Sequence, residues 1–318
     1  MPLVEVNEVG GGVYRVTHPL PFALNHVHTY AISGADGWTV VDAGLAANAE
    51  ARWTEALERL GHPRVTRIVL THYHPDHVGG AEALRRVTGA EEVLQSRRDA
   101  ELCRNAYAHP ESFEELRRHF TAQGMPSETV EASVSGEQAL SVAPPEPTRL
   151  IEDGDLLELA AEEFEVLHVP GHADGHIALL GGRTGRMFGG DVLLRRITPN
   201  VATWHDTDPD PLARYLSTLD RLEALRPAVV FPGHHSDLLD AAERAAEIRE
   251  HHRVRLDVHH EALRTGAVTP WEVSRLVWDG DLTLHELRFA LLEAVSHLVR
   301  LERLGRAHEL APGRWRAL

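Results

Sequence analysis

Seven consecutive residues, Thr71-His72-Tyr73-His74-Pro75-Asp76-His77, contain four side chains of the types that bind metal ions. They directly follow an apolar run, residues 65–70, that predicts a β-strand. Alternate side chains of a strand share one face, so His72 and His74 can reach one metal ion. Asp76 and His77 lie beyond the strand end and can turn toward a second ion. A lone histidine would be weak evidence in a chain that has 22 of them, so the hypothesis of a metal-centred hydrolase depends on the other motifs.

Four further apolar runs also end in a residue that can bind a metal ion or orient a ligand. Pro-Gly-His follows two of these runs and places His172 and His234 just past the predicted strand ends. Asp42 and Asp191 follow the other two. Ligand-type residues therefore occur at five predicted strand ends in chain order, which is more than scattered histidines would explain.

These five motifs resemble those of the metallo-β-lactamase superfamily over roughly residues 10–240. The resemblance implies an α/β fold, the four-layer αβ/βα sandwich. It also implies that Asp42 orients a ligand without binding metal. Two metal sites joined by a bridging carboxylate are implied, and their ligands are His72, His74 and His172 for the first ion, Asp76, His77 and His234 for the second, and Asp191 between them.

Imidazole and carboxylate ligands suit two divalent ions, of which zinc is expected first and manganese or iron are alternatives. Two ions about 3.5–4 Å apart can share a bridging hydroxide, which would be the nucleophile at neutral pH. We expect Asp76 to act as a catalytic residue that holds this hydroxide in line for attack. No separate serine or cysteine nucleophile is then needed.

Composition indicates a soluble, cytoplasmic enzyme. The chain has 318 residues with 43% hydrophobic content, and no stretch approaches the ~20 apolar residues of a membrane span. The amino terminus lacks a basic start followed by an apolar core, so no signal peptide is expected. The single Cys103 excludes an internal disulfide.

The chain contains no lysine, because all 32 basic side chains are arginine. Any anchor for an anionic substrate group must therefore be an arginine, a hydroxyl or a backbone N–H. This argues against a β-lactamase activity that clamps a substrate carboxylate with lysine. Arg195 and Arg196, which follow Asp191, are candidates for facing the pocket and binding such a group.

The motifs need a scaffold, and the apolar patterns predict one. Residues 1–240 are expected to form the catalytic domain. A charged, helical insertion at about 97–136 is a candidate lid over the pocket, with Tyr107 as a possible substrate contact. The expected elements are strands at 14–16, 28–32 and 38–41 in a first antiparallel sheet, strands at 155–159, 164–169, 178–180 and 187–189, and helices at 47–60, 81–87 and 211–225.

Residues 241–318 predict a long helix, to about residue 265, and then a compact unit with a helix at 282–304 and a small hairpin closed by Trp315. This tail resembles the winged helix of some metallo-β-lactamase-fold proteins, including a mitochondrial β-lactamase-like endoribonuclease. From Asp240 onward there are 12 Arg and 13 Asp plus Glu, a net charge of −1, which leaves about −15 for the rest of the chain. That balance disfavours a nucleic-acid partner, so the tail is expected to pack on the catalytic domain or form a homodimer contact.

Several other histidines are expected to lie outside the metal shell. His176 is expected to support the structure or orient a ligand. His235 should point away from His234 if the backbone there is extended. Four histidines of the long helix are expected at its solvated surface, namely His251, His252, His259 and His260.

The leading hypothesis is hydrolysis of a small molecule, most simply a thioester, lactone or related ester. One alternative is an endoribonuclease or phosphodiesterase, motivated by the tail. Another is a mononuclear-iron persulfide dioxygenase, against which the retention of His234 argues because the second site is then complete. A non-catalytic DNA-binding or scaffold protein with a vestigial site is the weakest interpretation.

Overall fold

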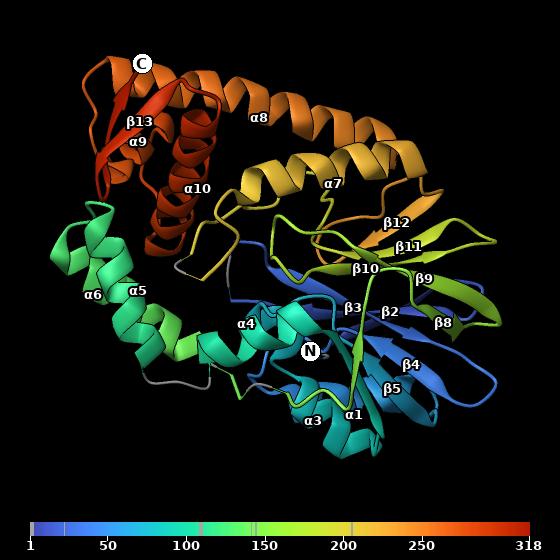
Figure 1. Ribbon diagram of the computed structural model, residues 1–318. Helices are drawn as coiled ribbons and strands as arrows, with labels where there is room; N and C mark the ends of the chain where they lie inside the picture. Colours follow the sequence, from blue (N-terminus) through green and yellow to red (C-terminus); the bar gives the residue numbers. More distant parts are fainter. Residues whose placement is uncertain (1–2, 22, 108–110, 141, 144, 205) are drawn as a thin grey trace.

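The computed structural model describes the whole chain except residues 1–2, 22, 108–110, 141, 144 and 205. Two β-sheets face each other, and helices cover the outer face of each (Figure 1). Trp53 and Leu84 pack between helices and the first sheet, Phe164 and Phe188 lie between the two sheets, and Tyr215 packs where helices cover the second sheet. The four-layer αβ/βα sandwich expected from the sequence is confirmed.

The first sheet has seven strands in chain order. Its first four pair antiparallel, as expected for the three of them that the sequence predicted, but the last three are added in parallel. Parallel neighbours need crossovers, which helices α1 (Ala49–Arg59) and α3 (Ala81–Thr88) supply. The strands are β1 (Glu5–Gly10), β2 (Val13–Pro19), β3 (His26–Ile32), β4 (Trp38–Val41), β5 (Val65–Val69), β6 (Glu92–Ser96) and β7 (Arg149–Ile151).

The second sheet has five strands in the order β12-β11-β10-β9-β8. Strands β8 to β11 pair antiparallel, and α7 (Pro211–Leu225) carries the chain across so that β12 joins β11 in parallel. The bounds are β8 (Leu156–Leu159), β9 (Glu162–His168), β10 (Ile177–Gly181), β11 (Arg186–Gly190) and β12 (Val229–Pro232). The carboxyl ends of β11 and β12 therefore lie side by side.

The predicted insertion is helical in the residues that the structure describes. It consists of α4 (Arg97–Tyr107), α5 (Glu111–Ala122) and α6 (Ser127–Leu140), placed between β6 and β7. Phe120 is fully buried, whereas Tyr107 and Phe113 are only partly buried. The insertion reaches the last long helix of the chain at α6 (Figure 1).

After β12 come α8 (Ala241–Arg264), α9 (Pro270–Val277) and α10 (Leu284–Arg303), followed by the hairpin of β13 (Ala307–Ala311) and β14 (Arg314–Ala317). Helix α10 packs on α8, α9, α7 and α6, so the tail lies against the body of the protein. Trp315 is buried at the hairpin, as expected. The description of this tail as a winged helix stays a prediction. None of the helices in the described residues is both long and apolar enough to cross a bilayer.

The expectation of four solvated histidines on the long helix is wrong for two of them. His252 and His259 are fully buried in α8. Residues seven apart share one helix face, and here that face packs on α10, where the ring of His297 stacks on His259 at 4.3 Å between centroids. His251 and His260 flank this face and stay partly exposed.

Candidate metal centre

All the predicted ligands lie at one edge of the sandwich, each just past the end of a strand. Strand β5 leads into His72 and His74, and Pro75 then begins the short helix α2 (Pro75–Val78), which turns the next two ligands inward. The other ligand strands are β9, which precedes His172, β11, which precedes Asp191, and β12, which precedes His234.

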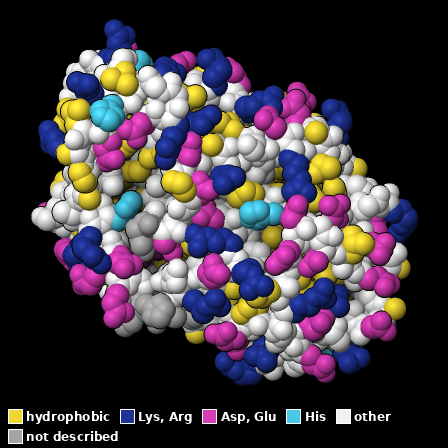
Figure 2. Space-filling view, in the orientation of Figure 1, with side chains coloured by type: hydrophobic (Ala, Val, Ile, Leu, Met, Phe, Trp, Pro, Cys, Tyr) yellow, Lys and Arg dark blue, Asp and Glu magenta, His cyan; other side chains and the backbone are white. Residues whose placement is uncertain are grey.

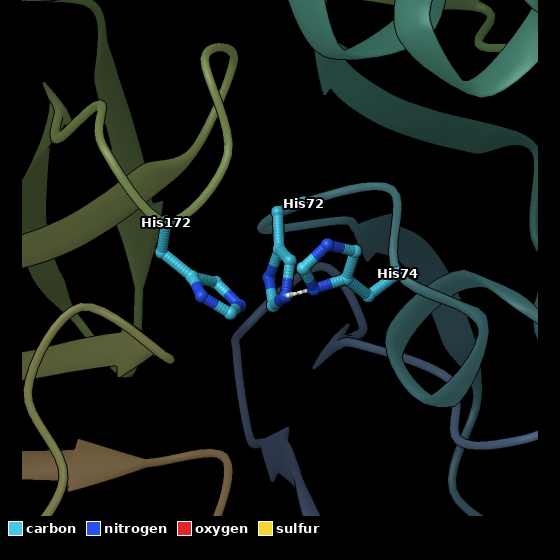
Figure 3. Close-up of side chains that lie close together, drawn as sticks. All are labelled: His72, His74 and His172. Atoms are coloured by element: carbon cyan, nitrogen blue, oxygen red, sulfur yellow. Dashed lines mark hydrogen bonds between the residues drawn. The ribbon is translucent and has the colours of Figure 1, made fainter. Parts of the chain in front are cut away.

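The first cluster consists of His72 and His74, from the segment after β5, and His172, from the segment after β9, and their rings point toward one another (Figure 3). One ring nitrogen of each lies within 4.8 Å of those of the other two. His72 Nε2 is 3.1 Å from His74 Nδ1. Three imidazole nitrogens directed at a common point are a suitable donor set for one ion.

The second cluster consists of Asp76, His77 and His234, whose ligand atoms also lie within 4.8 Å of one another. Asp191 lies between the two clusters. Its Oδ1 is 3.5 Å from His77 Nε2, and its Oδ2 is 3.3 Å from His234 Nε2 and 3.7 Å from His172 Nε2. A single carboxylate thus reaches histidines of both clusters, which is the position that a bridging ligand requires.

Buried atoms without hydrogen-bond partners test whether metal ions fit here. His77 Nε2, His172 Nε2, His234 Nε2 and Asp191 Oδ1 are buried and lack a hydrogen bond of acceptable geometry, although carboxylate oxygens lie nearby. Leaving several polar atoms unsatisfied in one place is costly. Nitrogen and oxygen donors of this kind are the ligands that zinc, manganese and iron accept, so the residues fit divalent cations.

Hydrogen bonds behind the clusters fix the orientation of the rings. His77 Nδ1 donates to Asp42 Oδ2 over 2.8 Å, and Asp42 also accepts from the N–H and hydroxyl of Thr71. His172 Nδ1 donates to the carbonyl of Asn200, and His234 Nδ1 donates to the carbonyl of His26, both over 2.7 Å. These bonds leave Nε2 of each ring free to face the centre. Asp42 lies where the sequence places an orienting carboxylate.

The charges of the clusters favour a cation. Burial would raise the pKa of Asp191, but the histidines His234 and His77 outweigh it and hold this pKa well below its usual range. Burial would lower the pKa of His77, but Asp191 and Asp42 outweigh it and raise this pKa well above its usual value. Burial lowers the pKa of His72, which is therefore neutral, the form in which a histidine binds metal.

Close backbone approach explains the glycines of the Pro-Gly-His motifs. A Cβ on Gly233 would lie 2.4 Å from Asp191 Oδ1 and 2.6 Å from His77 Cε1. A Cβ on Gly171 would lie 2.3 Å from the Cβ of Tyr215, and Gly171 also has a φ of +134°. The chain therefore needs glycine beside each of these two histidine ligands.

Beside the clusters lies a cavity of about 600 Å³, whose wall includes His74, Asp76, His172, Asp191 and His234. Tyr107 is also part of the wall, as predicted, and its hydroxyl donates to the carbonyl of Tyr73 over 3.2 Å. The insertion therefore does contribute to the pocket.

Two expectations about neighbouring residues differ from the structure. Arg195 and Arg196 are exposed and lie outside the cavity wall, although Leu194 and Ile197 on either side of them are part of it, and Arg195 Nη1 lies 3.6 Å from Asp240. His235 has a left-handed φ of +66°, not an extended backbone, and the residue is part of the wall.

His176 lies beside the centre without joining either cluster. Its ring is fully buried, 4.6 Å from that of His72 between centroids, and neither ring nitrogen has a hydrogen-bond partner. The carbonyls of Asn200 and His26, which orient two ligands, had no signal in the sequence, since every residue has a backbone carbonyl.

Residues 23–234 match the family described as "Metallo-beta-lactamase superfamily". The Bacillus subtilis (strain 168) protein named "Probable metallo-hydrolase YqjP" is 27% identical over 308 residues, which cover 91% of this chain and 92% of that protein. The Gallus gallus protein named "Acyl-coenzyme A thioesterase MBLAC2" is 26% identical over 194 residues, covering 58% of this chain and 64% of that protein. A crystal structure of a metallo-beta-lactamase family protein from Thermus thermophilus is similar with a TM-score of 0.86 and 32% identity, covering 98% of this chain and 100% of that one.

Proposed function

The chain belongs to the metallo-β-lactamase superfamily and is a metal-dependent hydrolase, and we propose that it cleaves a thioester, lactone or related ester. We propose that His72, His74 and His172 hold one divalent ion, that Asp76, His77 and His234 hold a second, and that Asp191 bridges them. Zinc is the expected metal, and manganese and iron suit the same ligands. The observation that carries the proposal is the position of the Asp191 carboxylate between histidines of both clusters.

Two bound divalent ions supply a nucleophile at neutral pH and polarise the carbonyl of the substrate. The protein's own side chains would orient the attacking group. The Asp76 carboxylate is part of the cavity wall, and Oδ2 lies 3.3 Å from His234 Nε2. Its pKa lies below its usual range because the histidines His77 and His234 outweigh the effect of burial, so it is ionised and can accept a hydrogen bond from the attacking group.

The ester preference has two supports. A relative from Gallus gallus is named an acyl-coenzyme A thioesterase, so the same family scaffold serves that chemistry in another protein. The cavity beside the centre is mainly apolar, which suits an acyl group. An endoribonuclease activity has no comparable support, because Arg and acidic side chains are intermixed on the face shown in Figure 2, with no continuous field of arginine there to bind a polyanion.

The test starts with protein purified without added metal. Elemental analysis would give the identity and number of bound metal ions, and the same sample would be assayed against a thioester, a lactone, a cephalosporin and single-stranded RNA. We expect two zinc or manganese ions per chain with ester or thioester turnover. One iron ion with oxygen uptake on a persulfide would replace the proposal with a dioxygenase, and RNA cleavage would replace it with a nuclease.

Variants test the second cluster separately. Asp76→Ala and His77→Ala should each lower the metal content toward one ion per chain and abolish turnover. The matched control is His308→Ala, at an exposed histidine of the C-terminal hairpin, which should change neither the metal content nor the turnover. Full metal content with a normal rate in His77→Ala would refute the two-metal mechanism.

A further inference from the structure

We propose that the substrate carries a long apolar acyl group attached to an uncharged leaving group. This inference rests on the proposed function, because it places the ester bond at the metal centre and the acyl group in the adjoining cavity. It goes further by naming the chemical character of the acyl group and of the leaving group that this bond joins. The observations that carry it are the composition of the cavity wall and the distribution of charge within it.

Apolar side chains from three distant parts of the chain build most of the cavity. The insertion contributes Leu102, Phe113 and Leu116, the segment after β11 contributes Trp204, and α10 contributes Phe289. The volume of about 600 Å³ lies within the range of about 300–1,000 Å³ that ligand pockets occupy. Helices α6 and α10 are in contact, so the insertion and the tail together enclose this side of the pocket.

An apolar wall of this size would be costly to leave facing water beside a polar reaction centre. An acyl chain that fills it gains about 0.8 kcal/mol for each buried methylene, equivalent to about a fourfold gain in affinity. A short acyl group such as acetyl leaves most of the wall uncovered. The geometry therefore favours a chain long enough to pass from the metal centre to Phe113 and Leu116 in the insertion.

The charged groups of the wall indicate the nature of the leaving group. Outside the metal clusters, the wall residues that the structure describes include the acidic residues Asp206 and Glu286, and Glu137 with its ion-pair partner Arg288. A fourth acidic residue, Glu293, is buried, which raises its pKa to about 7, so it adds little negative charge.

Arg288 already has an anionic partner, although its buried Nε atom has no hydrogen-bond partner. Its side chain is 6% exposed, it forms an ion pair with Glu137, and its Nη2 lies 3.0 Å from His285 Nδ1. With no lysine in the chain, no free cation of the described wall would offset the charge of a polyphosphate carrier. An uncharged leaving group avoids this repulsion.

Thioesters of N-acetylcysteamine and of coenzyme A, each with acetyl, hexanoyl and decanoyl chains, separate the two halves of the inference. We expect kcat/KM to rise about 100-fold or more from acetyl to decanoyl in the uncharged series. At equal chain length the coenzyme A thioesters should react about tenfold more slowly at low salt, and high salt should narrow the gap. Equal rates for acetyl and decanoyl, or faster hydrolysis of the coenzyme A series, would overturn the inference and leave the esterase proposal intact.

A variant that fills part of the cavity tests where the acyl chain of the substrate lies. Ala106, on α4, is part of the wall, and Ala106→Phe should lower the preference for decanoyl over acetyl at least tenfold. The control is Ala51→Phe on α1, an exposed position outside the wall, which should keep the wild-type preference. An unchanged preference in Ala106→Phe would contradict the placement.

Binding without turnover distinguishes the inference from the proposed function. Calorimetry with the S-ethyl and S-decyl thioethers of N-acetylcysteamine, which lack the acyl carbonyl and cannot be hydrolysed, should show tighter binding of the decyl compound. If no ester is cleaved, the proposed function fails, and this measurement alone then decides the inference: equal binding of the two thioethers, or no binding, refutes it.

Discussion

The Nδ1 atom of His77 donates a hydrogen bond to Oδ2 of Asp42 over 2.8 Å, and both side chains are buried. Asp42 belongs to the turn after β4, whereas His77 belongs to α2, so the bond ties two strand ends together. The same carboxylate accepts two hydrogen bonds from Thr71. Asp42 therefore fixes both the direction of the His77 ring and the start of the segment that carries His72 and His74.

Asp42→Asn should weaken metal binding without removing a ligand. Loss of the carboxylate lowers the basicity of His77 and loosens its ring, and such orienting partners typically contribute about 10–100-fold in metal affinity. Competition with a chelator of known affinity measures this. Asp220→Asn, at an exposed helix position that pairs with Arg249, is the control and should bind metal normally. Wild-type affinity in Asp42→Asn would rule out the orienting role.

Gly233→Ala should disrupt the second cluster through a steric clash. The new Cβ would lie 2.4 Å from Asp191 Oδ1, so the carboxylate must move from its place between the clusters. We expect loss of one metal ion and of turnover, with a cost in stability of about 1–3 kcal/mol. Elemental analysis and chemical denaturation check the two parts.

Gly136→Ala is the matched control for Gly233→Ala. Gly136 lies within α6, and nothing lies within 4 Å of where its Cβ would be. Alanine should therefore stabilise the helix by about 0.5–1 kcal/mol and keep both ions. Two bound ions with a normal rate in Gly233→Ala would show that Asp191 tolerates the displacement.

Glu293 should make stability depend on pH. Burial raises its pKa from 4.5 to about 7, so between these values the folded protein holds a proton that the unfolded chain releases. Stability attributable to this group therefore falls as pH rises from 4.5 to 7 and stays low above that. Glu293→Gln should match the wild type near pH 4.5 and exceed its unfolding free energy by up to about 3 kcal/mol at pH 8. Denaturant titrations at both pH values measure the difference, which must grow with pH for the explanation to hold.

Leu298→Ala should destabilise the whole protein and not the tail alone. Leu298 is fully buried in α10, in the same apolar cluster as Leu219 and Tyr215 of α7. Removing its side chain should cost about 2–5 kcal/mol. A single shifted unfolding transition, seen by both tryptophan fluorescence and circular dichroism, is expected, whereas a separate early transition would mean that the tail unfolds independently. Leu239→Ala, at a position 76% exposed, should stay within about 0.5 kcal/mol of the wild type.

The ligand motifs could be located from the sequence because their residue types and their places after apolar runs are visible in it. His72, Asp191 and His234 all follow strands that the apolar pattern predicts. Strand β1 was missed, since half of its residues, Glu5–Gly10, are polar and none of them is buried at the sheet edge. Strands β6 and β7 were missed as well: β6 ends in the buried polar residues Gln95 and Ser96, and β7 has only three residues.

Side-chain direction was the other source of error. His252 and His259 were expected at the surface because histidine is polar, but the packing of α8 on α10 places them inside. His235 was expected to point away from His234 if the backbone there is extended, and its left-handed φ of +66° removes that condition. Neither tertiary packing nor one backbone dihedral can be inferred from local pattern.

Two kinds of segment form the cavity wall. One kind carries the metal ligands at strand ends, and the other carries no metal ligand. The insertion at 97–140 and helix α10 supply much of the apolar surface, whereas the ligands follow strands of the two sheets. If the cavity wall selects the substrate, as proposed, then substrate preference and hydrolytic chemistry are encoded in different stretches of the gene. Laboratory recombination could exchange the insertion and α10 as a pair, joined by Arg288 and Glu137, to redirect the enzyme toward new acyl groups while its reaction stays the same.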